Sequence, residues 1–186
     1  MTHPVILTAI DMRPGSFVVV DEALRIALER GAKELHVLSV AEPAVAVGVD
    51  MSAAPYAELF RVDTKALASY VRERVDALKQ ERPDAAFPTI EVHGSVGRPA
   101  DEIVWLAAHL DADAIVVGTH NQRGITRFLL GSVAEKVVRL AGCEVVVVRP
   151  KSHKAEWRVP EIEPLCPDCA EARKSSAGAK LWCARH

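Results

Sequence analysis

Short apolar runs alternate along the chain with longer segments in which apolar residues recur every three or four positions. Short runs rich in branched side chains are typical of buried strands, and periodic segments are typical of helices with one buried face. The predicted strands are residues 5–10, 34–40, 89–93, 114–117 and 144–148. A predicted helix follows each of the first four strands: one after Ser16, one over residues 55–80, one from Pro99 and one from Gly131-Ser132.

This regular alternation predicts an α/β fold. Nearly continuous apolar strands are typical of a parallel sheet covered by helices on both faces, and right-handed crossovers favour a doubly wound layer. Local signals indicate where the first helix begins and ends, because Ser16 is expected to cap it and Gly31 stands where a left-handed residue terminates a helix. Residues 41–54 have no clear period and are expected to form a mobile loop.

The pattern stops at Pro150, which divides the chain into three parts. Residues 1–150 form the predicted α/β domain, and residues 151–165, with two prolines and many charges, form a predicted linker. Residues 166–186 offer few large apolar side chains and cannot build a core of their own. We therefore expect a separate small unit at the C-terminal end.

Charge and hydropathy argue against nucleic-acid binding, membrane insertion and export. The chain carries 23 Lys and Arg against 25 Asp and Glu, a net charge of −2, which argues against nucleic acid as the main partner. No apolar run approaches the roughly 20 residues of a membrane span. The N-terminus has no basic segment before its short apolar stretch, so it predicts a first strand and not an export signal. We expect a cytoplasmic protein.

Candidate ligand-binding residues collect where the predicted strands end. In doubly wound sheets, ligands bind beyond the carboxyl ends of the strands, where the strand order reverses. Asp11 follows the first strand, Val40 ends the second and Gly118 ends the fourth. Gly131 and Ser132 open a helix whose first N–H groups would attract phosphate. The alternative is that residues 132–135 form a capping box, which satisfies the same N–H groups without a ligand.

At these residues the sequence resembles the universal stress protein family. The resemblance covers residues 3–150 and rests on ILTAID with Asp11, on the turn 97–99 and on the stretch VVGTHNQRGITRFLLGSVAEKVVRLAGCEVVVVR. Nucleotide-binding members of the family carry G-x2-G-x9-G-[ST] in that stretch. Gly118, Gly131 and Ser132 match this motif in register, whereas Asn121 stands in place of its second glycine.

The resemblance implies a fold, a ligand and an assembly. It implies the strand order 3-2-1-4-5 and an ATP site, with Asp11 and the backbone at Val40 facing the base and ribose. Gly118, Asn121 and the pair 131–132 would face the ribose and phosphates. It also implies a homodimer that pairs two copies of the edge strand 144–148. A bare apolar edge strand needs to be paired or covered, and the alternative is that the C-terminal segment folds over this edge.

The C-terminal segment carries a second motif. Cys166-Pro-Asp-Cys169 is followed, after thirteen residues, by Cys183-Ala-Arg-His186. Two such pairs suit tetrahedral zinc with three thiolates and one imidazole. A redox-active disulfide and unligated cysteines remain the alternatives.

Three functions are compatible with these features. The sequence shows no activated nucleophile and no general-base pair, which favours a non-enzymatic, ATP-binding stress-response protein. The first alternative is an interaction protein, in which an inert dimeric body carries a zinc knuckle that recruits a partner. The second is a weak nucleotide hydrolase.

Overall fold

The computed structural model describes residues 3–13, 15–42, 62–119, 131–151 and 166–186. Most of the predicted loop 41–54, the first part of the predicted helix 55–80, Asn121 and residues 152–165 of the predicted linker lie outside these ranges. The structure divides into two compact units, Met1–Pro150 and Lys151–His186, which we describe separately.

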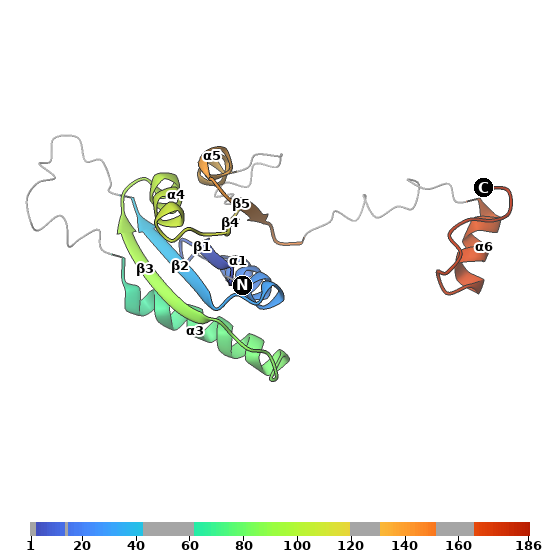
Figure 1. Cartoon of the computed structure of the whole chain (residues 1–186), viewed down its shortest axis with the longest axis horizontal. Coiled ribbons are helices and arrows are strands. Elements are labelled where there is room, and N and C mark those ends of the chain that lie inside the picture. Colours follow the sequence, from blue (N-terminus) through green and yellow to red (C-terminus); the bar gives the residue numbers. More distant parts are fainter. Residues whose placement is uncertain (1–2, 14, 43–61, 120–130, 152–165) are drawn as a thin grey trace, which may run out of the picture. The chain divides into compact units, whose positions relative to one another are not determined.

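The first unit is built on a five-stranded parallel sheet (Figure 1). Its strands lie in the order β3-β2-β1-β4-β5, so β1 separates the two halves of the sheet and β5 is an edge. This confirms the predicted fold class and strand order. The strands are β1 (Val5–Ala9), β2 (Glu34–Ala41), β3 (Thr89–Val96), β4 (Ala114–Gly118) and β5 (Glu144–Val148).

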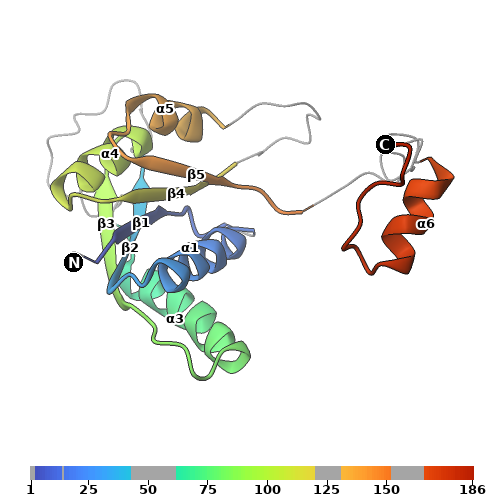
Figure 2. The same ribbon diagram turned by 45° about the vertical axis from the view of Figure 1, so that its right-hand side comes forward.

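Helices cover both faces of the sheet (Figure 2). One face carries α1 (Phe17–Arg30) and α3 (Thr64–Glu81), and the other carries α4 (Pro99–His109) and α5 (Ser132–Leu140). Successive residues of a strand point to opposite faces, so Ile6 joins the core under α1 and α3 while Leu7 joins the core under α4 and α5. Both side chains are fully buried, which explains why the strands have near-continuous apolar sequences.

Local chemistry determines where the helices begin and end. Gly31 adopts a left-handed conformation with φ 64°, and its N–H donates to carbonyls of the last turn, as predicted for the end of α1. Pro99 opens α4, where a missing N–H is harmless. The predicted helix 55–80 is not continuous, and its residues 55–61 lie outside the described residues. Residues 62 and 63 are not helical, and the Asp63 carboxylate caps the helix by accepting from the N–H groups of Lys65 and Ala66.

The predicted cap at Ser16 is also wrong. Ser16 has a helical backbone, and its side chain makes no capping hydrogen bond. Its hydroxyl donates instead to the carboxylate of Asp11 at 2.6 Å, across the turn between β1 and α1. No helix among the described residues is long and apolar enough to cross a membrane.

Candidate functional sites

Five of the six predicted nucleotide-site residues belong to the segments that end β1, β2 and β4 or begin α5. Asp11 follows β1, Val40 is the second-to-last residue of β2, and Gly118 is the last residue of β4. Gly131 and Ser132 begin α5, which returns from β4 to β5. The strand order reverses between β1 and β4, so the structure puts these residues at the switch point of the sheet. Asn121, the sixth, lies outside the described residues.

Asp11 organises the turn in which it stands. Its Oδ1 accepts from the Ser16 hydroxyl at 2.6 Å and from the Arg13 backbone N–H at 3.1 Å. The Arg13 guanidinium lies 3.7 Å from the other carboxylate oxygen, and Met12 between them adopts a left-handed φ of 55°. The Asp11 side chain is 37% exposed, so the turn fixes a carboxylate that solvent still reaches. A fixed, accessible carboxylate is suited to accept ligand hydroxyls.

Gly118 has a packing role that the sequence did not reveal. A Cβ built on Gly118 would lie 2.9 Å from Cγ2 of Val19, a buried residue of α1. Carbon atoms pack best at about 3.5–4.0 Å, so a side chain at this position would collide with the helix. The missing side chain of Gly118 therefore lets α1 pack against the end of β4.

The N-terminus of α5 is not closed by the predicted capping box. Gly131 is the cap residue and Ser132 is the first residue of the helix, whereas a capping box requires Ser132 at the cap itself. No side chain among the described residues makes a capping hydrogen bond here. The first backbone bond of the helix runs from the Glu135 N–H to the Gly131 carbonyl at 2.9 Å. No group among the described residues accepts from the N–H groups that precede Glu135, so on this part of the structure they are available to solvent or to a ligand.

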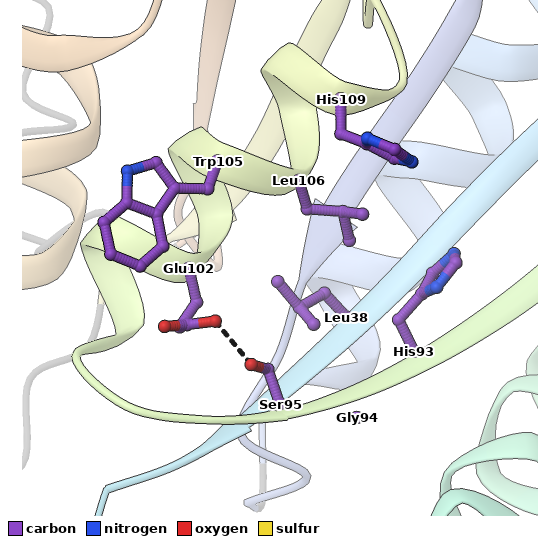
Figure 3. Close-up of a pocket in the computed structure, with 8 residues that line it drawn as sticks. All are labelled: Leu38, His93, Gly94, Ser95, Glu102, Trp105, Leu106 and His109. Carbon is purple, nitrogen blue, oxygen red and sulfur yellow. Dashed lines mark hydrogen bonds between the residues drawn. The ribbon is translucent and has the colours of Figure 1, made fainter.

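A hollow lies between α4 and the β2–β3 pair, with a volume of about 330 Å³ (Figure 3). Leu38 and Leu106 point into its middle, and His93 and His109 lie at one end. At the other end Ser95 donates to Glu102. The full lining is Leu38, His93, Gly94, Ser95, Glu102, Trp105, Leu106 and His109.

Sequence reasoning missed a histidine pair beside this hollow. Nδ1 of His36 lies 2.9 Å from Nε2 of His93, and Nε2 of His36 lies 3.5 Å from a carboxylate oxygen of Glu34. His36 is only 6% exposed, and burial lowers the pKa of His93, with the charge of its partner acting in the same direction. The register of β2 and β3 sets His36 opposite Glu91 and His93 opposite Leu38. That register is the signal that would have revealed the diagonal pair.

The second unit brings together the four predicted metal-binding residues. Its helix α6 (Pro167–Ser175) begins just after Cys166 and carries Cys169 in its first turn. The chain then reverses through Ala177 and Gly178, both with positive φ, and returns Cys183 and His186 to the start of the helix. The sulfur and nitrogen atoms that these four residues offer to a metal all lie within 4.8 Å of one another.

Individual contacts tie this cluster together. Nδ1 of His186 lies 3.1 Å from Sγ of Cys169 and 3.8 Å from Sγ of Cys183, and the Cys183 N–H donates to Sγ of Cys169 at 3.4 Å. Outside the cluster, the Arg185 guanidinium pairs with the Asp168 carboxylate and links the two ends of the unit.

The donor set and its spacing fit zinc. Three thiols and one imidazole are a common structural zinc set, and tetrahedral bonds of about 2.0–2.3 Å hold neighbouring ligand atoms about 3.5–3.8 Å apart. A cluster whose ligand atoms already lie within 4.8 Å needs only a small contraction to reach that geometry. The fourth cysteine, Cys143, lies half-buried in the other unit, where burial raises the pKa of its thiol.

Known proteins resemble this chain in sequence and in fold. The model of the universal stress protein family matches residues 3–149. A universal stress protein of Methanocaldococcus jannaschii is 43% identical over 79 residues, which are 41% of this chain and 46% of that protein. The chain spans about half the length of the curated relatives it matches.

Solved structures extend the likeness to the whole first unit. The universal stress protein UspA from Lactobacillus plantarum has a TM-score of 0.59 and 25% identity, over 80% of this chain and 99% of that chain. A universal stress protein crystallised in complex with cAMP has a TM-score of 0.57 and 25% identity, over 80% of this chain and 98% of that chain. With the family model matching residues 3–149, the chain belongs to the universal stress protein family.

Proposed function

We propose that the first unit binds an adenine nucleotide, ATP, and acts in the cytoplasm as a non-enzymatic stress-response protein. The observation that carries the proposal is the start of α5, which lies at the switch point and has no side-chain cap among the described residues. Helix N-termini attract phosphate through their free N–H groups and their dipole. Family membership and the cAMP complex of a relative support the same ligand class.

Each proposed contact follows from the position of a residue. The Asp11 carboxylate would accept ribose hydroxyls, and the backbone of Val40 would face the base. Ser132 would add a hydroxyl donor to the N–H groups of the first turn of α5, where the phosphates would bind. Gly118 would contribute backbone only, because its side-chain space belongs to Val19. Asn121, which lies between β4 and α5 in the sequence, would face the phosphates.

Titration calorimetry with ATP tests this proposal. We expect heat of binding at one site per chain, with affinity reduced in Ser132→Ala because one phosphate donor is lost. Ser175→Ala, which removes a hydroxyl from the other unit, is the matched control and should bind as the parent protein does. If the parent protein gives no heat of binding with ATP, the proposed nucleotide binding is wrong. The alternative, an inert dimeric body that carries a partner-recruiting zinc knuckle, would then be favoured.

A second function belongs to the C-terminal unit. We propose that it binds one zinc ion through Cys166, Cys169, Cys183 and His186, and that the ordered unit presents a surface to a partner protein. The observation that favours it is the convergence of these four ligand atoms within 4.8 Å. Zinc would supply folding free energy to a segment that has almost no apolar core.

Metal analysis separates this proposal from its alternatives. Protein purified without added zinc should carry about one zinc per chain, and Cys169→Ser should lose it. Cys143→Ser is the matched control, because Cys143 belongs to the other unit and should leave the zinc content unchanged. Metal-free protein with Cys166 and Cys169 joined in a disulfide would support the redox alternative instead.

A further inference from the structure

Apart from its metal-binding residues, the C-terminal unit is held together by exposed polar contacts, such as Arg185 with Asp168 and Arg173 with the Leu181 carbonyl. Within α6 the buried residue is Cys169, which is 2% exposed. The two large apolar side chains of residues 166–186, Leu181 and Trp182, are 56% and 60% exposed. Ordering a short segment costs conformational entropy on every residue, and within residues 166–186 little buried apolar surface offsets that cost. The fold of residues 166–186 therefore depends on the bonds among the four clustered residues.

Two of the three cysteines in this cluster are partly exposed to solvent. Cys166 and Cys183 are half-buried, and His186 is exposed. The third sulfur, on Cys169, is covered but lies within 4.8 Å of both others. A small polar oxidant can therefore reach a first sulfur, and a second sulfur is near enough to react with the product. Bound zinc would hold all three as thiolates, the form that attacks peroxides.

We propose that the C-terminal unit is a peroxide-sensitive switch, in which oxidation of two thiolates to a disulfide releases zinc and unfolds residues 166–186. This inference rests on the zinc binding proposed above and adds its regulation. The co-reactant is a hydroperoxide, which the cluster would meet from solvent.

The chemistry balances in two steps. A thiolate of Cys166 or Cys183 attacks one peroxide oxygen, the O–O bond breaks, and the departing hydroxide takes up a proton to become water. The Cys169 thiolate then attacks the resulting sulfenic acid, an S–S bond forms, and a second hydroxide leaves and becomes water. Two sulfurs have lost two electrons and one hydrogen peroxide has gained them. Zinc keeps only one thiolate and one imidazole, so it dissociates.

Hydrogen peroxide added to the full chain provides the test. A chromogenic chelator should register one zinc released per chain as two thiols disappear, and peptide mass mapping should find Cys169 in the disulfide. Trypsin should then cut after Arg173 and Lys174 at least tenfold faster, while the first unit stays resistant. Dithiothreitol with added zinc should restore both the metal and the resistance to trypsin. Cys143→Ser should behave as the parent chain does.

The possible failures can be told apart. If the untreated protein holds no zinc, the proposed metal binding is wrong and the switch falls with it. If zinc is bound but excess peroxide leaves it in place, metal binding stands and the switch is overturned. Zinc release with oxidation to sulfonic acid and no disulfide, or release without faster cutting by trypsin, also overturns the switch.

Discussion

A single methyl group at Gly118 should destabilise the first unit. The Cβ of alanine would lie 2.9 Å from Cγ2 of Val19, about 0.6 Å inside the closest favourable carbon–carbon separation. Val19 is 7% exposed, so it cannot swing into solvent, and α1 or the end of β4 must move. Overpacking of this kind costs about 1–3 kcal/mol.

The net loss of stability in Gly118→Ala should be smaller than the cost of the steric overlap alone. Alanine reduces the entropy of the unfolded chain, which stabilises the fold by about 0.4–1 kcal/mol. A net loss of about 1–2 kcal/mol remains, which corresponds to a Tm lower by about 2–8 °C in a chain of this size. Gly142→Ala is the matched control, because a Cβ on Gly142 meets nothing within 4 Å and its φ is not left-handed. The control should be neutral or slightly stabilising.

Urea unfolding of four proteins tests the physical cause. Val19→Ala removes the methyl group that the new Cβ would touch, so Gly118→Ala should cost less in that background than in the parent chain. Contacting residues show such coupling energies at about 0.5–3 kcal/mol. Equal stability of Gly118→Ala and Gly142→Ala, or strict additivity with Val19→Ala, would refute the packing role of Gly118.

Three further changes and one measurement of the oligomeric state have defined outcomes. The free energy of unfolding should fall as the pH drops below about 6.5. Burial lowers the pKa of His93 in the folded protein, so at these pH values the unfolded chain binds more protons than the folded one. Urea unfolding between pH 5 and 8 should show this dependence, and His93→Gln should weaken it. Asp63→Ala should cost about 0.5–2 kcal/mol in the same assay, because the α3 N–H groups lose their cap. Asn121→Gly should tighten ATP binding about tenfold in calorimetry, or about 1.4 kcal/mol, because it restores the second glycine of the motif; unchanged affinity would mean that Asn121 points away from the ligand. Light scattering should show a dimer joined through the β5 edge, and a monomer at micromolar concentration would contradict that assembly.

The sequence predicted the fold well because its strands are short apolar runs, of which the three central ones are buried on both faces. An apolar run such as the fifth strand, Glu144–Val148, needs no long-range information to be recognised, and the structure gives it the predicted bounds. The order of the strands came from the resemblance to the universal stress protein family. Helix ends were less predictable. The apolar periodicity begins before Asp63, so the pattern alone did not show that α3 starts after this residue.

The site details depended on contacts between distant segments. A serine before a helix is a common cap, but the Ser16 hydroxyl donates to Asp11 instead, and only the folded turn decides between these two roles. Gly118 matched a ligand motif, yet its nearest neighbour is a valine of α1, a hundred residues away in sequence. The pair of His36 and His93 required the register of two strands. In contrast, the cysteine motif was local enough to predict the convergence of its four ligands.

Native mass spectrometry of the full chain, purified with neither nucleotide nor zinc added and then mixed with ATP, tests the central claim most directly. The claim is that this chain combines a nucleotide-binding universal stress protein unit with a zinc-bound C-terminal unit. We expect a dimer whose mass exceeds that of the bare polypeptide by one zinc ion and one ATP per chain. A mass equal to the bare polypeptide, before and after addition of ATP, would contradict it.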